Sequence, residues 1–310
     1  MRLTWPDNKK FAFTIVDDTD MSTVFNTKPV YDLLLNLGIR TTKTVWIYPS
    51  RDKFTGGCLS DNDYMTFILW LRDNDFEIAF HGAGSGDFKR QEIILSLEIF
   101  NQIIGYYPKL HVNHANNLDG IYWGQKRFSL PLKIIYKLLF LNGLKFSGEN
   151  IDSSYFWGDI CKHHVKYIRN RIYTNINTLK YDPYMPYKEV EKELYSNYWF
   201  SSSDGYDVNT FCSLMKTEDI DRLSEEGGCC IAYTHFGSGF VDEYGKLSQK
   251  FKENIEYLSS KNAWFAPASE ILDYMLENKG SDEYLSALNS FKMDAIWFVE
   301  RVYRKLFMKE

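Results

Sequence analysis

Short apolar runs alternate with longer segments of helical pattern along most of the 310-residue chain, and this alternation limits the fold more than any other feature. Strand-like runs occur at 11–16 (FAFTIV), 42–48 (TKTVWIY), 76–80 (FEIAF) and 109–114 (KLHVNH). A helical pattern follows each run, as in KPVYDLLLNLGI and RQEIILSLEIFNQII. Repeated strand-then-helix order is typical of a mostly parallel sheet with helices outside it, either doubly wound or closed into a barrel.

The alternation is interrupted between about 145 and 195, where Tyr, Asn and Asp are frequent and YDPYMPY marks irregular chain. We interpret this stretch as an insertion of loops and non-barrel strands. The alternation resumes at 198–207, 229–237 and 263–267. The sequence therefore predicts one α/β domain over 1–278, followed by a helical extension over 279–310.

The C-terminal extension has a helical pattern with apolar residues near one face and a basic, aromatic end. These apolar residues are Leu285, Leu288, Phe291, Ile296, Val299 and Val302. Two interpretations are open: the helix packs on the domain or on a second subunit, or it rests on an anionic lipid surface. The sequence does not indicate an oligomeric state.

Charge and composition exclude several classes of protein. The chain has 41 acidic and 36 basic residues, so its net charge of -5 leaves no basic footprint for a nucleic acid. Its five cysteines lack any CxxC spacing, which favours reduced thiols over a disulfide framework. No apolar segment of signal-peptide type and no run long enough to span a membrane is present, so we expect a cytoplasmic protein.

Polar and titratable side chains follow several of the predicted strands directly. Since ligands of sheets built from βα units bind at the carboxyl ends of the strands, these side chains outline a candidate site. They are Asp17, Asp18, Thr19 and Asp20 after the first strand, His81 after FEIAF, His111, Asn113 and His114 at the fourth strand, Ser203 and Asp204 after YWFSS, and His235 after CCIAY.

One carboxylate and two imidazoles are a common ligand set for a catalytic divalent metal. A neighbouring carboxylate can then take a proton from the attacking water, and a further histidine can protonate the leaving group. This combination predicts metal-assisted hydrolysis of an amide or ester. The structural alternatives are that Asp20 caps the following helix and that each histidine is a hydrogen-bonded structural residue.

The order of these motifs resembles that of the NodB-type polysaccharide deacetylases, carbohydrate esterase family four and its relatives. FTIVDDTD is similar to their first motif, a strand that ends in T-F-D-D-G, and EIAFHGAGS is similar to the second, which ends in H-x-x-x-H. IAYTHFG resembles the final strand with its L-x-H, and NAWFAPASEILDYM the closing strand and helix. The likeness covers roughly residues 8 to 278 and lies in motif order more than in long identities.

The resemblance implies a distorted, seven-stranded (β/α) barrel and a metal-dependent hydrolase that removes an N-acyl (acetyl) group from an amino sugar. In the matching positions, Asp17 would be the general base, Asp18 and His81 metal ligands, and His235 the general acid. The metal would be Zn²⁺, with Co²⁺ and Ni²⁺ as alternatives. As a cytoplasmic relative, the protein would act on a nucleotide sugar or a lipid-linked intermediate in surface-polysaccharide (O-antigen-type) synthesis, with peripheral membrane contact through the C-terminal helix.

The sequence departs from the family pattern at two places. The second histidine position, four residues after His81, is Ser85, whose neutral hydroxyl is a poor zinc ligand. The arginine-proline motif is replaced by HVNHANN. We expect His114 to supply the missing nitrogen, with His111 as the weaker candidate. Side chains expected to contact substrate are Ser85, Asn113, Trp123, Ser203 and Asp204; the last two either orient His235 or form a turn.

Two alternatives remain open from the sequence. The first is a metal-independent hydrolase that uses Asp17 and Asp204 as a glycosidase-like acid and base pair. The second is a non-catalytic glycan-binding relative that has lost its metal together with the histidine replaced by Ser85. The separation of the two carboxyl groups tests the first, since such enzymes hold them about 5 to 9.5 Å apart. The orientation of His114 tests the second, because a ring that points away from Asp18 and His81 favours binding without catalysis.

Overall fold

The computed structural model describes residues 3–139, 146–279 and 283–307 of the chain. The strands are β1 (Phe11–Asp17), β2 (Thr42–Val45), β3 (Glu77–Phe80), β4 (Leu110–His111), β5 (Tyr167–Tyr173), β6 (Tyr198–Asp204), β7 (Cys229–Thr234) and β8 (Ala263–Phe265). The α-helices are α1 (Val24–Asn36), α2 (Asn62–Asp73), α3 (Arg90–Ile104), α4 (Leu132–Leu139), α5 (Gly158–His164), α6 (Thr178–Tyr181), α7 (Val208–Leu214), α8 (Thr217–Glu226), α9 (Gln249–Ser259), α10 (Ala268–Asn278) and α11 (Ala287–Phe307). Three 3₁₀ turns complete the set: η1 (Pro6–Asn8), η2 (Gly124–Arg127) and η3 (Val190–Lys192).

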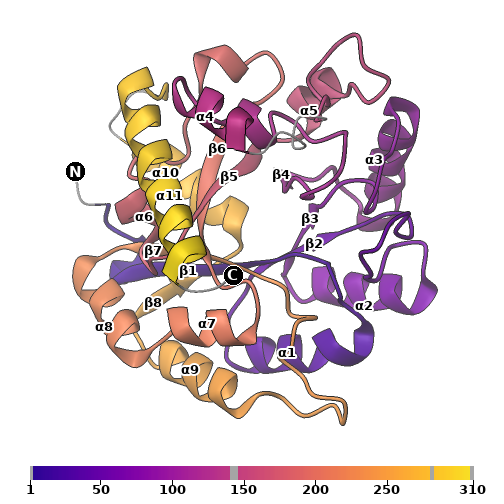
Figure 1. Ribbon diagram of the computed structural model, residues 1–310. Coiled ribbons are helices and arrows are strands. Elements are labelled where there is room, and N and C mark those ends of the chain that lie inside the picture. The colour runs from indigo at the N-terminus through magenta and orange to yellow at the C-terminus, as the bar shows by residue number, and fades with distance from the viewer. Residues whose placement is uncertain (1–2, 140–145, 280–282, 308–310) are drawn as a thin grey trace.

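The first seven strands form a closed parallel barrel. Their order is β2-β3-β4-β5-β6-β7-β1, and β1 pairs back with β2 to close the ring. The helices lie around the outside of this ring (Figure 1). The predicted seven-stranded α/β barrel is therefore confirmed.

The barrel is distorted because β1 changes its neighbour along its length. At its start, Phe11–Phe13 pair with β8, whereas at its end Val16 and Asp17 pair with β2. β8 thus pairs with the start of β1, and β2 closes the barrel only against the carboxyl end of β1. Asp17 is the last residue of β1, so the candidate residues that follow it emerge at this closure.

Strand and helix boundaries follow local sequence signals. All seven residues of β1 are buried, as expected for a continuous apolar run with helices on one side and the barrel interior on the other. Helix α1 begins at Thr23, whose hydroxyl accepts from Asn26 N while the Asn26 side chain accepts from Thr23 N. Because Thr23 forms this cap, Asp20 is free for another role.

The stretch from 145 to 195, expected to be an insertion outside the barrel, contributes a barrel strand. It contains α5, β5, α6 and η3, and β5 pairs in parallel with β4 and β6. The sequence of β5, YIRNRIY, has polar residues where the other strands have apolar ones, so it does not contain the apolar run by which the other strands were predicted. These arginines are buried nevertheless, since each is paired with an aspartate: Arg169 with Asp18, and Arg171 with Asp294.

Helix α11 packs on the barrel against β5 (Figure 1). Arg171 Nη2 of β5 lies 2.6 Å from Asp294 Oδ1, and both side chains are fully buried. Ser129 donates to Asp294 through both its backbone N and its Oγ, each at 2.8 Å. Of the six apolar residues predicted to share one face, Leu285 is buried, Phe291 is half-buried, and the others are exposed, namely Leu288, Ile296, Val299 and Val302.

We predict that Asp294→Ala lowers the free energy of unfolding by about 3–5 kcal/mol, because it leaves the buried Arg171 guanidinium without its counter-charge. Urea unfolding followed by circular dichroism measures this loss. The control is Lys28→Ala, which removes an exposed ion pair with Asp32 and is expected to cost less than about 1 kcal/mol. Equal losses of unfolding free energy in the two variants would mean that the buried Arg171–Asp294 pair stabilises the protein no more than an exposed ion pair does.

Candidate metal and catalytic site

Titratable side chains from four strands meet at the carboxyl edge of the barrel. Asp18 and Asp20 follow β1, His81 follows β3, His114 lies three residues beyond β4, and His235 follows β7. All five side chains are buried. Since the carboxyl ends of parallel barrel strands converge, residues that are far apart in the sequence become neighbours here.

Asp20 is at the centre of this group. Its Oδ2 lies 3.1 Å from His81 Nε2, and its Oδ1 lies 3.0 Å from His114 Nε2. The ligand atoms of these three residues lie within 4.8 Å of one another, which is close enough for all three to contact one ion. Asp20, His81 and His114 therefore form a candidate metal centre, called here the Asp20 cluster.

The hydrogen bonds on the far side of each ring orient the two histidines. His81 Nδ1 lies 3.0 Å from the carbonyl oxygen of Val112, which can only accept, so Nδ1 carries a proton. His114 Nδ1 lies 3.0 Å from Asn117 Oδ1, and Asn117 is itself oriented by Gly86 N, which donates to Oδ1, and by its Nδ2, which donates to Gly84 O. Partners of this kind hold metal-ligating histidines in the required tautomer.

This arrangement points both Nε2 atoms at a carboxylate. With Nδ1 protonated, a neutral imidazole presents a lone pair at Nε2, and a lone pair facing a carboxylate oxygen at 3.0–3.1 Å is repulsive. Either both rings are doubly protonated or a cation lies between them and Asp20. The donor set, two nitrogens and a carboxylate in a buried position, fits a divalent metal.

The electrostatics of the Asp20 cluster favour the charged forms. Burial opposes ionisation of Asp20, but the hydrogen bonds with His114 and His81 outweigh it and lower the pKa of the carboxyl well below its usual value. Burial would likewise lower the pKa of His114, but the hydrogen bond and charge of Asp20 raise it. The cluster thus holds a negative charge that attracts a cation even when the histidines are neutral.

Asp18 lies beside the cluster and is held by Arg169 of β5. Arg169 Nη2 and Nη1 donate to Asp18 Oδ2 and Oδ1 at 2.6 and 3.3 Å, a two-point contact that fixes the carboxylate plane. Asp18 Oδ2 is also 4.0 Å from His81 Nε2. Burial would raise the pKa of Asp18, but the Arg169 charge, with His81 and His235 nearby, lowers it, so the carboxyl is ionised at neutral pH.

Asp17, which the resemblance makes the general base, has a different set of partners. Its Oδ2 accepts from Lys43 Nζ at 2.8 Å and from Tyr31 Oη at 3.0 Å, and its Oδ1 accepts from the backbone N of Phe236 at 2.8 Å. Asp17 and Lys43 are both fully buried. Within the described residues no hydrogen bond or ion pair joins Asp17 to the Asp20 cluster, so its contacts are those of a structural anchor.

His235, predicted as the general acid, borders the cluster on the β7 side. Its Nδ1 donates to the carbonyl oxygen of Tyr206 at 3.0 Å, which leaves Nε2 directed inward. Nε2 lies 3.3 Å from Tyr233 Oη and 3.7 Å from Asp20 Oδ2. The ring of Tyr233 in turn supports Arg169, whose guanidinium lies 4.4 Å from the ring centre.

Aromatic rings surround the two histidines of the cluster. Trp46 is buried and stacks on His81 with a centroid distance of 6.2 Å, and it meets the edge of His114 at 5.6 Å. Phe54 contacts His114 from another side at 5.0 Å. Such apolar walls exclude water from one side of the site and strengthen the interactions among its charges.

Several residues expected at the site have other partners. Ser85, at the family's second histidine position, donates its hydroxyl to Asp52 at 2.7 Å. Asn113 is bonded to the backbone N and O of Ile121, at 2.8 and 3.1 Å. His111 is buried beside Asn113, and burial lowers its pKa to about 4, so this weaker candidate is a neutral structural residue. The half-buried Trp123 ring faces Arg127 at 4.9 Å.

Ser203 and Asp204, expected to orient His235 or form a turn, end β6 and have separate roles. Ser203 Oγ bonds to Thr178 Oγ1 at 2.7 Å, which ties β6 to α6. Asp204 Oδ1 accepts from Tyr206 N at 3.3 Å, and the carbonyl of the same Tyr206 holds His235. Asp204 is thus linked to His235 through the Tyr206 backbone, and a role in orienting His235 stays a prediction.

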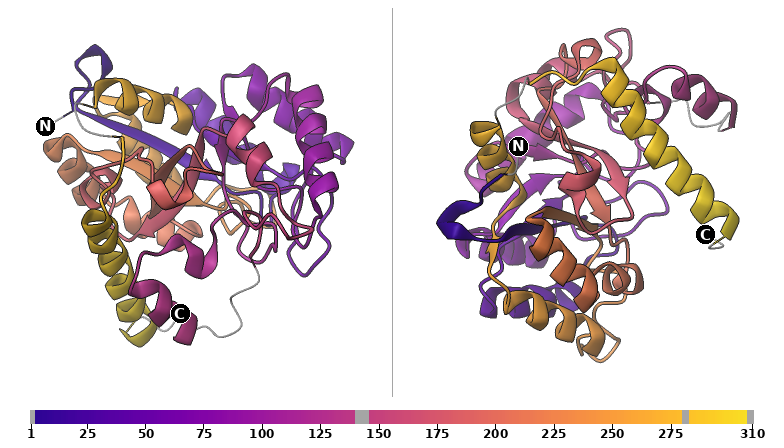
Figure 2. Two further views of the ribbon diagram at one scale, coloured as in Figure 1. Left: turned by 90° about the horizontal axis from the view of Figure 1, so that it is seen from above. Right: turned by 90° about the vertical axis from the view of Figure 1, so that its left-hand side faces the viewer.

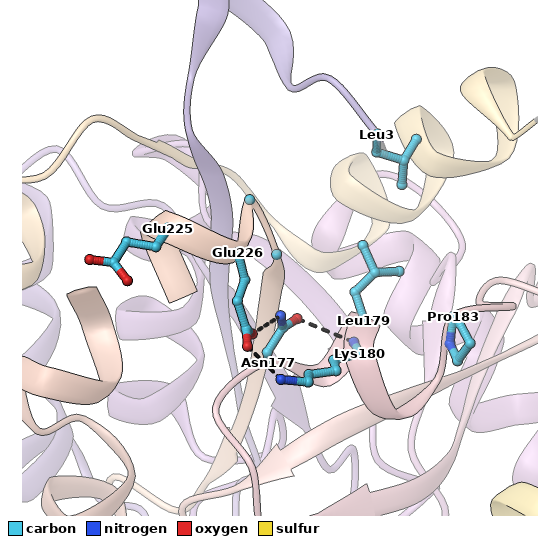
Figure 3. A pocket seen from close by; sticks show the side chains of 9 residues that line it. Leu3, Asn177, Leu179, Lys180, Pro183, Glu225 and Glu226 are labelled. Carbon is cyan, nitrogen blue, oxygen red and sulfur yellow. Dashed lines mark hydrogen bonds and ion pairs between the residues drawn. The ribbon is translucent and has the colours of Figure 1, made fainter. Parts of the chain in front are cut away.

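A separate hollow lies at the other end of the barrel (Figure 3). Its lining includes Asn177, Lys180 and Glu226, and Glu226 pairs with both of the other two, at 2.7 and 2.5 Å. Gly228, which also lines it, immediately precedes β7, whereas His235 immediately follows β7. The hollow is thus a full strand length away from the Asp20 cluster, and its charges are paired with each other.

Asp20 was expected among the polar residues at the strand ends, with helix capping as its alternative role, and Arg169 was not expected at the site; the structure gives both central positions. The signal against capping by Asp20 was Thr23, a better cap with Asn26 three residues later. Arg169 lies in a stretch interpreted as irregular. The sequence feature that could have indicated a strand here is YIRNRIY, in which charged residues occur between residues that favour β-strands.

Comparison with known proteins gives relatives by structure alone. No family model and no curated protein matches the chain. It is similar to a polysaccharide deacetylase from Bacillus cereus (9% identity, covering 83% of this chain and 91% of that chain, TM-score 0.41). It is also similar to a family 4 acetyl xylan esterase from Clostridium thermocellum in complex with a cobalt ion (10% identity, covering 92% of each chain, TM-score 0.35). A third similar structure is a protein from Bordetella bronchiseptica described as a polysaccharide deacetylase involved in O-antigen biosynthesis (10% identity, covering 94% of this chain and 92% of that chain, TM-score 0.38). These neighbours are of the family that the motifs resemble, and the likeness concerns the fold.

The ion pair of Asp18 predicts a pH-dependent contribution to stability. Because the pKa of Asp18 is lower in the folded protein than its value of about 3.9 in the unfolded chain, its stabilisation is present above about pH 4 and is lost as the pH falls through the folded pKa. In chelator-treated protein, Asp18→Asn should therefore cost more unfolding free energy near pH 7 than near pH 3. Urea unfolding at both pH values measures the two costs, and equal costs would contradict the assignment.

Proposed function

We propose that the protein is a metal-dependent hydrolase that removes an N-acyl group, such as acetyl, from an amino sugar. The observation that carries this proposal is the Asp20 cluster, in which two histidines with protonated Nδ1 atoms direct Nε2 at one buried carboxylate. An ionised carboxylate and a further histidine, Asp18 and His235, border the same cluster. Together these groups supply the parts that amide hydrolysis requires.

Asp20, His81 and His114 would hold the cation, with Zn²⁺ as the first candidate and Co²⁺ or Ni²⁺ as alternatives. A divalent cation bound there supplies Lewis acidity, which makes water a stronger acid and polarises the acyl carbonyl. His114 replaces the family's second histidine, whose position Ser85 occupies. The carboxylate is Asp20, two residues further along the chain than the one the resemblance indicates.

Asp18 would act as the general base. Arg169 keeps Asp18 ionised and fixes the plane of its carboxylate. Asp18 Oδ2 lies 4.0 Å from His81 Nε2, which is near the Asp20 cluster but outside the set of ligand atoms. From there it can take a proton from the attacking water. Asp17 has less support as this base, since Lys43, Tyr31 and Phe236 N take three of the roughly four acceptor positions of its carboxylate.

His235 would protonate the departing amine. Its Nδ1 is engaged by Tyr206 O, so the ring presents Nε2 to the site, next to Tyr233 Oη. A proton on Nε2 is necessary because the amine of a sugar is a poor leaving group until it is protonated. Asp204, which holds the Tyr206 backbone, is a positioning residue for this step.

The substrate would be an acylated amino sugar in a surface-polysaccharide precursor, presented as a nucleotide sugar or a lipid-linked intermediate. This assignment extends the motif resemblance and agrees with the O-antigen role given for one structural neighbour. We propose a cytoplasmic location for the same reason, since such precursors are assembled there.

The two alternatives have less support. A glycosidase-like pair of Asp17 and Asp204 requires an available Asp17, but that carboxylate is buried against Lys43. Glycan binding without a metal is favoured by a His114 ring that points away from Asp18 and His81. The ring instead lies 5.4 Å from that of His81 and its Nε2 faces Asp20.

The ligand assignment predicts different metal contents for two isosteric variants. Wild-type protein should contain about one equivalent of divalent metal, Asp20→Asn should lose it, and Asp18→Asn should retain it. His114→Ala should weaken metal affinity by roughly tenfold or more. Elemental mass spectrometry after dialysis measures the content. Loss in Asp18→Asn with retention in Asp20→Asn would instead assign Asp18 as the ligand.

The assignment of the base predicts a loss of turnover without a loss of metal. Asp18→Asn should lower kcat for acetate release from N-acetylated amino sugars by about 10²-fold or more. Asp17→Asn should mainly lower the free energy of unfolding, because it removes the counter-charge of buried Lys43, while folded molecules keep their kcat. The opposite pattern, with kcat lost only in Asp17→Asn, would return the base to Asp17.

A further inference from the structure

Helices α4 and α11 lie on the same side of the barrel (Figure 2), and both have apolar side chains exposed to solvent. The two helices contact each other, and Leu132 of α4 and Trp297 of α11 belong to one small apolar cluster, with the ring of Phe128, which precedes α4, 5.0 Å from that of Trp297. We call their exposed apolar residues the α4/α11 face: Leu130, Ile134, Ile135, Leu138, Leu288, Ile296, Val299 and Val302.

The α4/α11 face is not a by-product of packing against the barrel. Ile134 and Leu138 lie four residues apart on one face of α4, and Leu130 is exposed just before the helix, while Leu132 is buried. On α11, Ile296 and Val299 point outward while Trp297 points inward. Both helices are thus apolar on the outside as well as the inside, and a contiguous exposed patch of this kind marks a contact site.

The charges around the α4/α11 face are basic, although the chain as a whole is acidic. Residues 123–139 contain four lysines and arginines and no aspartate or glutamate, whereas the net charge of the protein is -5. Arg127 is buried and Lys126 pairs with Glu149, so Lys133 and Lys137 supply the accessible positive charge. Lys133 and Lys137 flank Ile134 and Leu138 on α4, and in the described part of the chain no acidic side chain pairs with either lysine. Of the acidic residues of α11, Asp294 is buried under the helix, and the half-buried Glu300 accepts from the backbone N of Thr174. Aliphatic side chains bordered by Lys133 and Lys137 complement an anionic lipid surface.

The α4/α11 face is continuous with the rim of the candidate site. Arg301 Nη2 of α11 lies 3.7 Å from Asp204 Oδ2 at the carboxyl end of β6. Asp204 binds Tyr206 N, and Tyr206 O holds His235. A surface that covers α11 would therefore lie next to the mouth of the Asp20 cluster.

We propose that the α4/α11 face docks the protein on an anionic phospholipid bilayer, with the carboxyl edge of the barrel close to the membrane. The contact is peripheral, because no helix within the described residues has the length and apolarity that crossing a bilayer requires. The aliphatic side chains enter the interface, and the lysines and arginines contact lipid phosphates. Docking is independent of the proposed hydrolysis and is tested without a substrate.

The first test is co-sedimentation of the full chain with vesicles of phosphatidylcholine, with and without phosphatidylglycerol. Binding is expected only with the anionic lipid, and it should weaken as salt is raised, because salt screens the lysines and arginines. Failure to sediment with phosphatidylglycerol vesicles at low salt would overturn the proposal.

The second test uses matched substitutions. Ile134→Glu and Val299→Glu, singly and together, should each lower vesicle binding by roughly tenfold or more, because a carboxylate opposes both apolar insertion and the anionic surface. Leu95→Glu on α3 is the control, since Leu95 is 54% exposed and Ile134 is 53% exposed. Circular dichroism and urea unfolding establish that each variant is folded.

Two further outcomes would overturn docking on lipid. Equal loss in Leu95→Glu would mean that any added negative charge weakens binding. If light scattering shows that Ile134→Glu converts a dimer to a monomer while vesicle binding is unchanged, a second copy of the chain covers the α4/α11 face instead.

Discussion

The buried ion pair between Asp17 and Lys43 holds together the edge of the barrel on which the candidate site is built. Asp17 ends β1 and Lys43 is in β2, so the pair joins the two strands at the only place where the barrel closes. The same carboxylate accepts from Tyr31 of α1 and from Phe236 N beyond β7. One side chain thus fixes the relative positions of β1, β2, α1 and the loop that carries His235. Breaking such a pair leaves a buried charge without its counter-charge, so the edge is held cooperatively.

The three aspartates at this edge, Asp17, Asp18 and Asp20, differ in role because their partners differ. Asp17 is neutralised by Lys43, Asp18 by Arg169, and Asp20 by the two histidines. Only Asp20 faces groups that can be neutral, which leaves its negative charge available to a cation. Local sequence places carboxylates close together, whereas long-range partners decide whether each is an anchor, a base or a ligand.

The part of this organisation that could be predicted from the sequence is the part fixed by local pattern. Apolar runs identified seven of the eight strands, and the histidines at strand ends, His81, His114 and His235, were predicted to gather because parallel strands converge. The roles of the aspartates could not be derived in this way, since Asp18 depends on Arg169, which is 151 residues away in the chain. Strand β5 was not predicted for the same reason. Its arginines can be buried because they pair with Asp18, which follows β1, and with Asp294 of α11.

The irregularity in β5 connects the interior of the barrel with its exterior. Residues two apart on a regular strand face the same side, but the register of β5 with β6 shifts between Arg169 and Ile172, and Arg169 and Arg171 reach different neighbours. Arg169 holds Asp18 inside the barrel, while Arg171 is clamped by Asp294 of the C-terminal helix. The last helix is therefore bonded to the same strand that carries the partner of Asp18. A chain shortened before residue 287 would retain Asp18 and Arg169 but leave the buried guanidinium of Arg171, two residues along that strand, without its carboxylate.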